Sequence, residues 1–205
     1  MLTNCFSDLG KLFDLEEFTN ECIKEIEDKI LFHGPETISC FIGEPVSQPL
    51  GGVVPPENYW AMVRELCDKY GIILIFDECS SAFRKVFGGL HKFYNIEPDM
   101  AIFGKALGNG YAITAVIGKK EYMDYAEASF ISSTFWTERI GPTAALETLK
   151  EMKRLKSWEK INKIGLKINN HWKKLMLKHN IVADIYGLPS LTSFVINSKN
   201  WLKYK

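Results

Sequence analysis

The chain has 205 residues, of which 46% are hydrophobic and 13% aromatic. This composition is typical of a globular protein with a sizeable core, and it excludes disordered and collagen-like architectures. The 25 Lys and Arg residues balance 25 Asp and Glu residues, so the chain lacks the net charge that nucleic acids or anionic membranes attract. We expect no nucleic acid and no membrane as partner. Because the N-terminus lacks a signal-peptide pattern and no segment reaches the ~18 apolar residues of a membrane span, we predict a cytoplasmic protein.

The cysteines and histidines predict neither disulfides nor a metal site. The five cysteines are odd in number, widely separated and mostly embedded in apolar segments, so reduced and mostly buried thiols are expected. The histidines are far apart and lack the spacing of metal ligands, so we expect them at the surface or in loops. They are His33, His91, His171 and His179.

Alternating helices and strands predict an α/β fold. Apolar residues recur at helical spacing over residues 15–30 and 57–70 and, as one long helix or two in tandem, over 141–178. Short apolar runs predict four strands, at residues 38–43, 72–76, 100–103 and 112–117. We expect these to form one mainly parallel sheet. Two further strands, at 181–184 and 191–196, are predicted in a separate unit.

Charged residues follow three of the predicted strands: Glu44, Asp77 and Lys105. Ligands of open parallel sheets bind beyond the carboxyl ends of the strands, so these side chains mark a candidate site. Strand ends also meet solvent and are often charged for that reason alone. A carboxylate after an entirely apolar strand, and a lysine between Gly104 and Ala106 after another, favour a functional interpretation.

A lysine and a carboxylate in this arrangement suit pyridoxal 5'-phosphate. A desolvated lysine amine can form a Schiff base with an aldehyde. A fixed carboxylate beside the pyridine nitrogen keeps that nitrogen protonated, which makes the ring an electron sink. Lys105 can play the first part and Asp77 the second.

The motifs around these residues resemble those of class-III pyridoxal-phosphate aminotransferases, most closely the glutamate-1-semialdehyde aminomutase branch. The matching motifs are Glu44-Pro45-Val46, Gly51 to Glu57, Phe76-Asp77-Glu78 with Phe83-Arg84, Gly104 to Tyr111, and Ser133-Thr134-Phe135. The resemblance implies part of a fold-type-I, aspartate-aminotransferase-like α/β protein. Residues 1–150 would be the C-terminal portion of the large cofactor-binding domain, and residues 151–205 a connecting helix with a partial small C-terminal domain.

The same resemblance implies roles for three residues. Lys105 would carry the cofactor as a Schiff base and later move protons as general base, and Asp77 would pair with the ring nitrogen. Thr134 matches a family threonine that reaches across a dimer interface to the cofactor phosphate of the neighbouring subunit. A threonine that caps the following helix is the alternative interpretation.

Other positions near the implied cofactor depart from the family pattern. Cys79 stands where the family usually has Val under the pyridine ring, and Ser80 stands where many relatives have Gln or Met. Glu44 would lie near the cofactor face as structural support. Pro49 replaces a second glutamate that some relatives use as a gate, and residues 136–139 replace the family's usual Ser-Gly-Asn-Pro. The last departure leaves the substrate preference open.

The expected function is pyridoxal-phosphate-dependent transfer or migration of an amino group, with a small-molecule amino donor and a keto or aldehyde acceptor. The resemblance also implies a homodimer with its active site at the subunit interface. The family's N-terminal phosphate-binding segment and its C-terminal end have no counterpart in the sequence. The alternative is therefore a catalytically inactive fragment, or a subunit that needs a separate N-terminal half. Substrate identity, and the choice between transfer and migration, stay open.

A nucleotide-binding enzyme is a weaker alternative. The Gly104-Lys105 pair lacks the upstream glycine and the following Ser or Thr of a Walker motif, because Asp99 and Ala106 occupy those positions. Ile113 breaks a dinucleotide fingerprint that would start at Gly108.

Overall fold

The computed structural model describes residues 15–131, 134–135 and 137–197 of the chain. The helices are α1 (Leu15–His33), α2 (Tyr59–Tyr70), α3 (His91–Tyr94), α4 (Lys120–Met123), α5 (Ile140–Leu155) and α6 (Ser157–Lys178). The strands are β1 (Cys40–Gly43), β2 (Ile73–Asp77), β3 (Met100–Phe103), β4 (Ala115–Gly118), β5 (Ala183–Tyr186) and β6 (Ser193–Ile196). Short 3-10 helices lie at Pro35–Thr37, Lys105–Leu107, Asp124–Ala126 and Pro189–Leu191. All predicted elements are present, and the long helical segment forms two helices.

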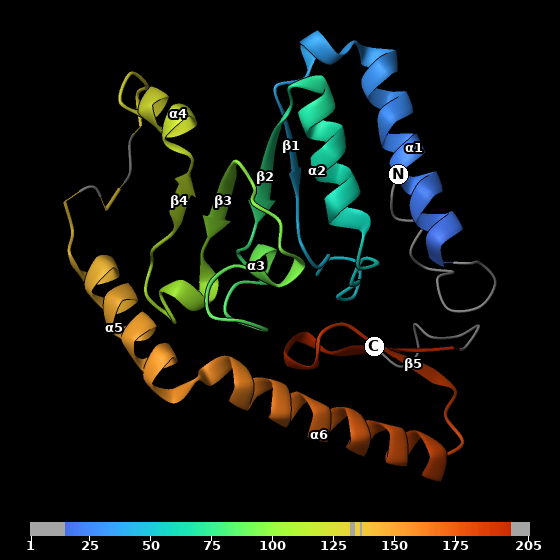
Figure 1. Ribbon diagram of the computed structural model, residues 1–205. Coiled ribbons are helices and arrows are strands. Elements are labelled where there is room, and N and C mark those ends of the chain that lie inside the picture. Colours follow the sequence, from blue (N-terminus) through green and yellow to red (C-terminus); the bar gives the residue numbers. More distant parts are fainter. Residues whose placement is uncertain (1–14, 132–133, 136, 198–205) are drawn as a thin grey trace.

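The main sheet has the strand order β1-β2-β3-β4 (Figure 1). The first three strands are parallel: Gly43 of β1 pairs with Phe76 of β2, and Asp77 of β2 pairs with Ile102 of β3. Strand β4 is antiparallel to β3. The connection over residues 104–114 contains a single short 3-10 helix, and such a segment reverses the chain more readily than it makes a parallel crossover. The mainly parallel sheet is thus confirmed, with an antiparallel strand at one edge.

The largest core cluster lies between the sheet and two helices. Helix α2 contributes Trp60 and Val63, which pack with Leu74 and Phe76 of β2, and α1 packs against α2 through residues such as Cys22. The rings of Trp60 and Phe76 are 4.5 Å apart. In Figure 1, α1 and α2 accordingly lie side by side next to β1 and β2. A second cluster joins β3 to α5 through Phe83, Phe103, Leu107 and Ala145.

Helices α5 and α6 meet at Lys156, whose φ of 47° lies in the left-handed region. Strands β5 and β6 form an antiparallel hairpin that packs on α6. A Cβ atom on Gly165 of α6 would lie 1.8 Å from the Pro189 carbonyl oxygen, so this contact requires glycine. The Arg84 carbonyl, in the loop after β2, accepts hydrogen bonds from Asn162 of α6 and from Ser190. The predicted domain boundary at residue 150 remains a prediction.

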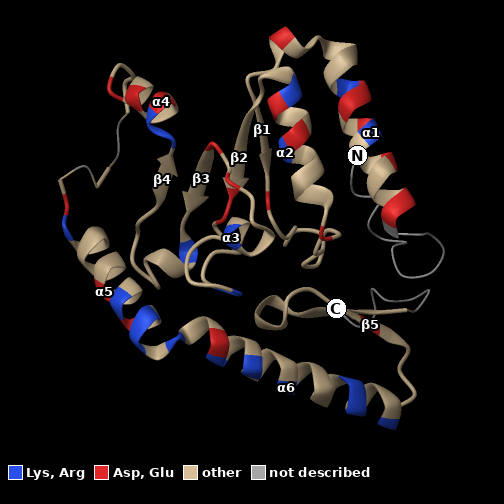
Figure 2. Ribbon diagram, in the orientation of Figure 1, with Lys and Arg blue, Asp and Glu red and all other residues tan. Residues whose placement is uncertain are grey.

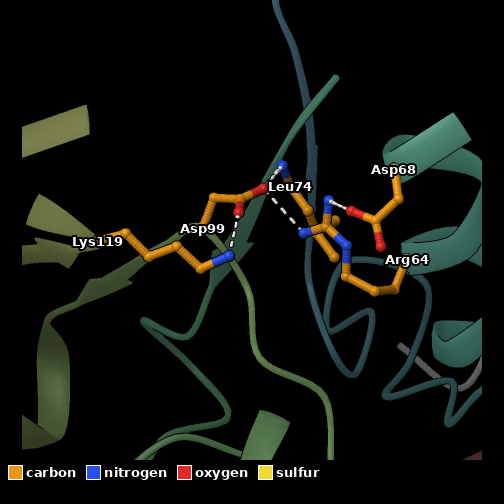
Figure 3. Close-up of polar contacts among 5 residues, drawn as sticks. All are labelled: Arg64, Asp68, Leu74, Asp99 and Lys119. Atoms are coloured by element: carbon orange, nitrogen blue, oxygen red, sulfur yellow. Dashed lines mark hydrogen bonds and ion pairs between the residues drawn. The ribbon is translucent and has the colours of Figure 1, made fainter. Parts of the chain in front are cut away.

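A buried ion cluster around Asp99 stabilises the amino end of β3 (Figure 3). One carboxylate oxygen of Asp99 accepts hydrogen bonds from the Leu74 N–H and from Arg64, each at 2.8 Å, and the other accepts one from Lys119 at 2.7 Å. Arg64 also pairs with Asp68 at 2.7 Å. Burial by itself would raise the pKa of Asp99, but hydrogen bonds from Lys119, the Leu74 N–H and Arg64 outweigh burial and lower it. The cluster joins α2 to three strands, at the edge opposite the candidate site.

One expectation from the sequence needs correction. His91 is expected at the surface or in a loop, but it begins α3 and its side chain is only 15% exposed, because it contacts the buried Glu78 carboxylate. Among the cysteines of the described ranges, Cys22 and Cys67 are buried, Cys79 is half-buried, and Cys40, which begins the edge strand β1, is exposed; Cys5 lies outside these ranges. Within the described ranges, no set of three or more His, Cys, Asp or Glu side chains is placed to hold a metal ion. None of the described helices could cross a membrane.

Candidate active site

Three predicted site residues meet at one edge of the sheet. Glu44 directly follows β1, Asp77 is the last residue of β2, and Lys105 follows β3 after Gly104. Because these strands are parallel and their ends are in register, all three residues lie at the carboxyl edge. Figure 2 shows acidic positions after β1 and β2 and a basic position after β3.

Lys105 presents its amine at the mouth of an open pocket. Its backbone has a φ of 42°, a left-handed conformation that side chains rarely adopt, and it begins a 3-10 helix. The residue is exposed, and its amine donates a hydrogen bond to the Ser80 hydroxyl. Lys105, Tyr111, Phe135 and Glu138 are among the residues that line this pocket of about 790 Å³. The amine is therefore accessible and held by a neutral partner.

The Asp77 carboxylate is half-buried and shapes the turn that follows β2. Its Oδ1 accepts a hydrogen bond from the Cys79 N–H at 3.0 Å. Burial raises the pKa of the Cys79 thiol, and its hydrogen bond with Asp77 raises it further. The charge of Lys105 opposes this shift, and the charge of Glu44 adds to it. The Cys79 thiol therefore lies within electrostatic reach of all three strand-end residues.

Gly104 lets the turns after β2 and β3 approach each other. A Cβ atom at this position would lie 3.2 Å from the Cys79 sulfur, which is tighter than ordinary van der Waals contact. Cys79 thus packs directly against the backbone that carries Lys105.

Glu44 and Thr134 form no hydrogen bond with Asp77, Cys79, Ser80 or Lys105 within the described ranges, although Glu44 lies at the same carboxyl edge. A carboxylate oxygen of Glu44 accepts the Gln48 N–H at 2.9 Å, so the side chain organises the loop after β1. It also lines a separate pocket of about 230 Å³ together with Trp60 and other apolar residues. Thr134 is exposed, and within the described ranges no hydrogen bond joins it to the other site residues. Its neighbour Phe135 lines the Lys105 pocket.

A buried carboxylate, Glu78, lies behind the site and was not among the residues predicted from the sequence. The fully buried Glu78 carboxylate accepts hydrogen bonds from the Ser81 hydroxyl at 2.5 Å and the His91 N–H at 2.9 Å. The His91 Nδ1 lies 3.0 Å from the same carboxylate. The burial of Glu78 could have been predicted, because successive residues of a strand point to opposite sides. If Asp77 faces the ligand edge, Glu78 faces inward and needs buried partners.

The family model described as "Aminotransferase class-III" matches residues 8–202. A glutamate-1-semialdehyde 2,1-aminomutase of Methanococcus maripaludis is 35% identical over 185 residues, which cover 89% of this chain and 43% of the relative. A 3-aminobutyryl-CoA aminotransferase of Cloacimonas acidaminovorans is 34% identical over 179 residues, which cover 86% of this chain and 43% of that protein. The chain therefore spans less than half the length of these relatives.

Solved transaminases share the fold. A thermostable omega transaminase variant from Pseudomonas jessenii superposes with a TM-score of 0.79 at 27% identity, over 90% of this chain and 43% of that one. An (S)-enantioselective omega-transaminase from Thermomicrobium roseum gives a TM-score of 0.74 at 28% identity, over 88% and 42%. These similarities confirm the expected α/β fold, which corresponds to part of a fold-type-I transaminase. The match of the family model over nearly the whole sequence shows that the chain belongs to the class-III aminotransferase family.

Proposed function

We propose that this protein takes part in pyridoxal-phosphate-dependent transfer or migration of an amino group, with Lys105 as the residue that carries the cofactor. The observation behind this proposal is the placement of Lys105 and Asp77 at the carboxyl ends of the neighbouring parallel strands β3 and β2. Family membership supports amino-group chemistry in general. Amino donor, acceptor and reaction type belong to the proposal, since one similar relative is an aminomutase and another an aminotransferase.

The residues present fit pyridoxal phosphate. The Lys105 amine is exposed and bonds a hydroxyl rather than a carboxylate, so a carbonyl carbon can reach it. Within the described ranges Asp77 bonds the Cys79 N–H and thiol rather than a cation, so its negative charge is available to a protonated ring nitrogen. When bound, the cofactor supplies an aldehyde that forms a Schiff base with a lysine and a ring that accepts electrons.

Each side chain then has a distinct task. The Lys105 amine anchors the cofactor and, when free, takes a proton from the substrate carbon and returns it. The Asp77 carboxylate holds the proton on the ring nitrogen. Cys79 stays a neutral thiol at neutral pH, because burial raises its pKa above the ordinary value, and packs as a small apolar surface. Ser80 and Glu44 complete the cofactor surroundings in this proposal.

Assembly belongs to the proposal as well. Thr134, exposed in the single chain, would bind the cofactor phosphate of the neighbouring subunit in a homodimer. The cytoplasmic location likewise remains a prediction.

The second candidate is a chain that is inactive alone and acts with a separate N-terminal half. Large apolar side chains around the sheet favour it, since Ile42, Val116 and Ile117 are 56%, 48% and 54% exposed. Both candidate functions assign Lys105 to the Schiff base and Asp77 to the ring nitrogen of the cofactor.

Borohydride reduction tests the assignment of Lys105. The chain is incubated with pyridoxal phosphate and reduced, and the modified lysines are identified by peptide mapping. We expect the adduct mainly on Lys105, lost in Lys105→Ala and retained in the matched variant Lys120→Ala, which removes another exposed lysine. An adduct spread evenly over surface lysines would overturn the assignment.

A further inference from the structure

The Ser80 hydroxyl accepts a hydrogen bond from the Lys105 amine. Ser80 lies three residues after the end of β2 and is half-buried, whereas Lys105 is exposed. An exposed lysine side chain normally samples many rotamers, and fixing it costs conformational entropy. A partner that is itself fixed is therefore needed to hold the amine at the strand end.

Backbone contacts hold Ser80 in a tight turn. The Ser80 carbonyl accepts a hydrogen bond from the Arg84 Nε at 3.3 Å. The Glu78 carbonyl accepts the Ala82 N–H at 2.9 Å, and the Glu78 N–H donates to the Ile102 carbonyl of β3 at 2.9 Å. The turn is thus tied to the strand that leads into Lys105.

The Glu78 side chain anchors the same turn from inside. Its carboxylate has no solvent exposure and accepts hydrogen bonds from Ser81, the next residue after Ser80, and from the His91 backbone. Ring Nδ1 of His91 completes the cluster. A buried carboxylate that loses such partners carries a large desolvation cost, so this arrangement strongly restricts the position of the turn.

We propose that Ser80 is a positioning residue for Lys105, and that the buried Glu78 fixes the turn so that the Ser80 hydroxyl meets the amine. This inference rests on the proposed function, because it describes how the cofactor-carrying amine is held while free. The hydroxyl keeps the amine at the carboxyl edge, near Asp77 and Cys79. Ser80 acts on the reaction through Lys105.

Competitive labelling of lysines by a limiting amount of an acylating reagent tests the contact without any cofactor. The labelling rate of Lys105 is measured across pH relative to the exposed Lys120. In Ser80→Ala the ammonium loses its acceptor, and we expect labelling at neutral pH to rise about threefold. Ser80→Thr retains a hydroxyl and should label like the native chain. In Ser80→Asp a new ion pair should stabilise the ammonium form of Lys105 and slow labelling about tenfold.

The control variant Ser129→Asp places the same charge on an exposed serine whose hydroxyl bonds the Tyr125 carbonyl, and it should leave Lys105 unchanged. Unchanged labelling in both Ser80→Ala and Ser80→Asp would overturn the proposal. Because no cofactor is present, that result differs from a failure of the proposed function, in which the reduced adduct maps away from Lys105 while the labelling effects persist.

Glu78→Gln tests the buried anchor. The amide keeps one acceptor oxygen but presents a donor toward Ser81 or His91, so the turn should loosen and Lys105 should label faster, as in Ser80→Ala. Asp99→Asn is the matched control, because it neutralises another buried carboxylate at the opposite edge of the sheet. If both variants change Lys105 labelling equally, general loosening explains the effect and the role of Glu78 is refuted.

Discussion

Replacing Asp99 by Asn tests whether the buried ion cluster stabilises the fold. The Asp99 side chain is 4% exposed and bonds two cations and one backbone N–H. Asparagine has nearly the same shape, but its amide group would face the donors of Arg64 or Lys119. Breaking a buried ion pair costs roughly 3 to 5 kcal/mol. Lys119 is 38% exposed and Arg64 keeps Asp68 as a partner, so we expect a loss of about 2 to 3 kcal/mol in the free energy of unfolding.

The assay is urea unfolding of the 205-residue chain, followed by tryptophan fluorescence. Asp68→Asn is the control: its side chain is 65% exposed, and such surface pairs contribute under about 1 kcal/mol. A loss in Asp99→Asn no larger than in Asp68→Asn would refute the reasoning.

The pH dependence of stability gives an independent check on the same residue. The folded-state pKa of Asp99 is lowered, while an unfolded Asp titrates near about 3.9. The stabilisation is therefore present above that unfolded pKa and is lost as the pH falls through the lower folded pKa. Stability of the native chain should decline below about pH 4, and Asp99→Asn should flatten that part of the profile.

Three further predictions concern the site and the hairpin. Asp77→Asn should leave the borohydride-reducible adduct on Lys105 but strongly slow turnover of the assembled enzyme, since the ring nitrogen loses its carboxylate; near-normal turnover would remove Asp77 from its role. Gly165→Ala should force α6 away from Pro189 and speed proteolysis within β5–β6, whereas the exposed Leu166→Ala should not. The isolated 205-residue chain should associate in sizing chromatography and show no transaminase activity with added pyridoxal phosphate; a purified monomer whose turnover Lys105→Ala abolishes would contradict this expectation.

The carboxyl edge could be predicted because its signals are local. An apolar strand that ends in Asp77, and a glycine followed by Lys105, are visible in the sequence, and parallel pairing brings such ends together. The antiparallel β4 could not be read from its apolar run, because orientation depends on the path of the connection. The phosphate-binding role of the exposed Thr134 could not be predicted from its local sequence either, and it follows from the family resemblance alone.

The partners of buried charges were less predictable. His91 lies 13 residues after Glu78, and Arg64 lies 35 residues before Asp99. Neither pair has a spacing that marks a contact, because tertiary packing alone brings the residues together. The sequence therefore suggests that a buried carboxylate needs partners but does not say which residues supply them.

These partners also explain why Asp77, and not its neighbour, suits a ligand. Glu78 is matched inside the protein by Ser81 and His91, and Asp99 is matched by two cations. Within the described ranges no lysine or arginine forms an ion pair with Asp77, which bonds the Cys79 N–H and thiol. A half-buried carboxylate without a cationic partner favours a protonated base beside it. A pyridine nitrogen at the carboxyl edge would meet that condition, and the adjacent Glu78, with its bonds already made, would not compete for the same proton.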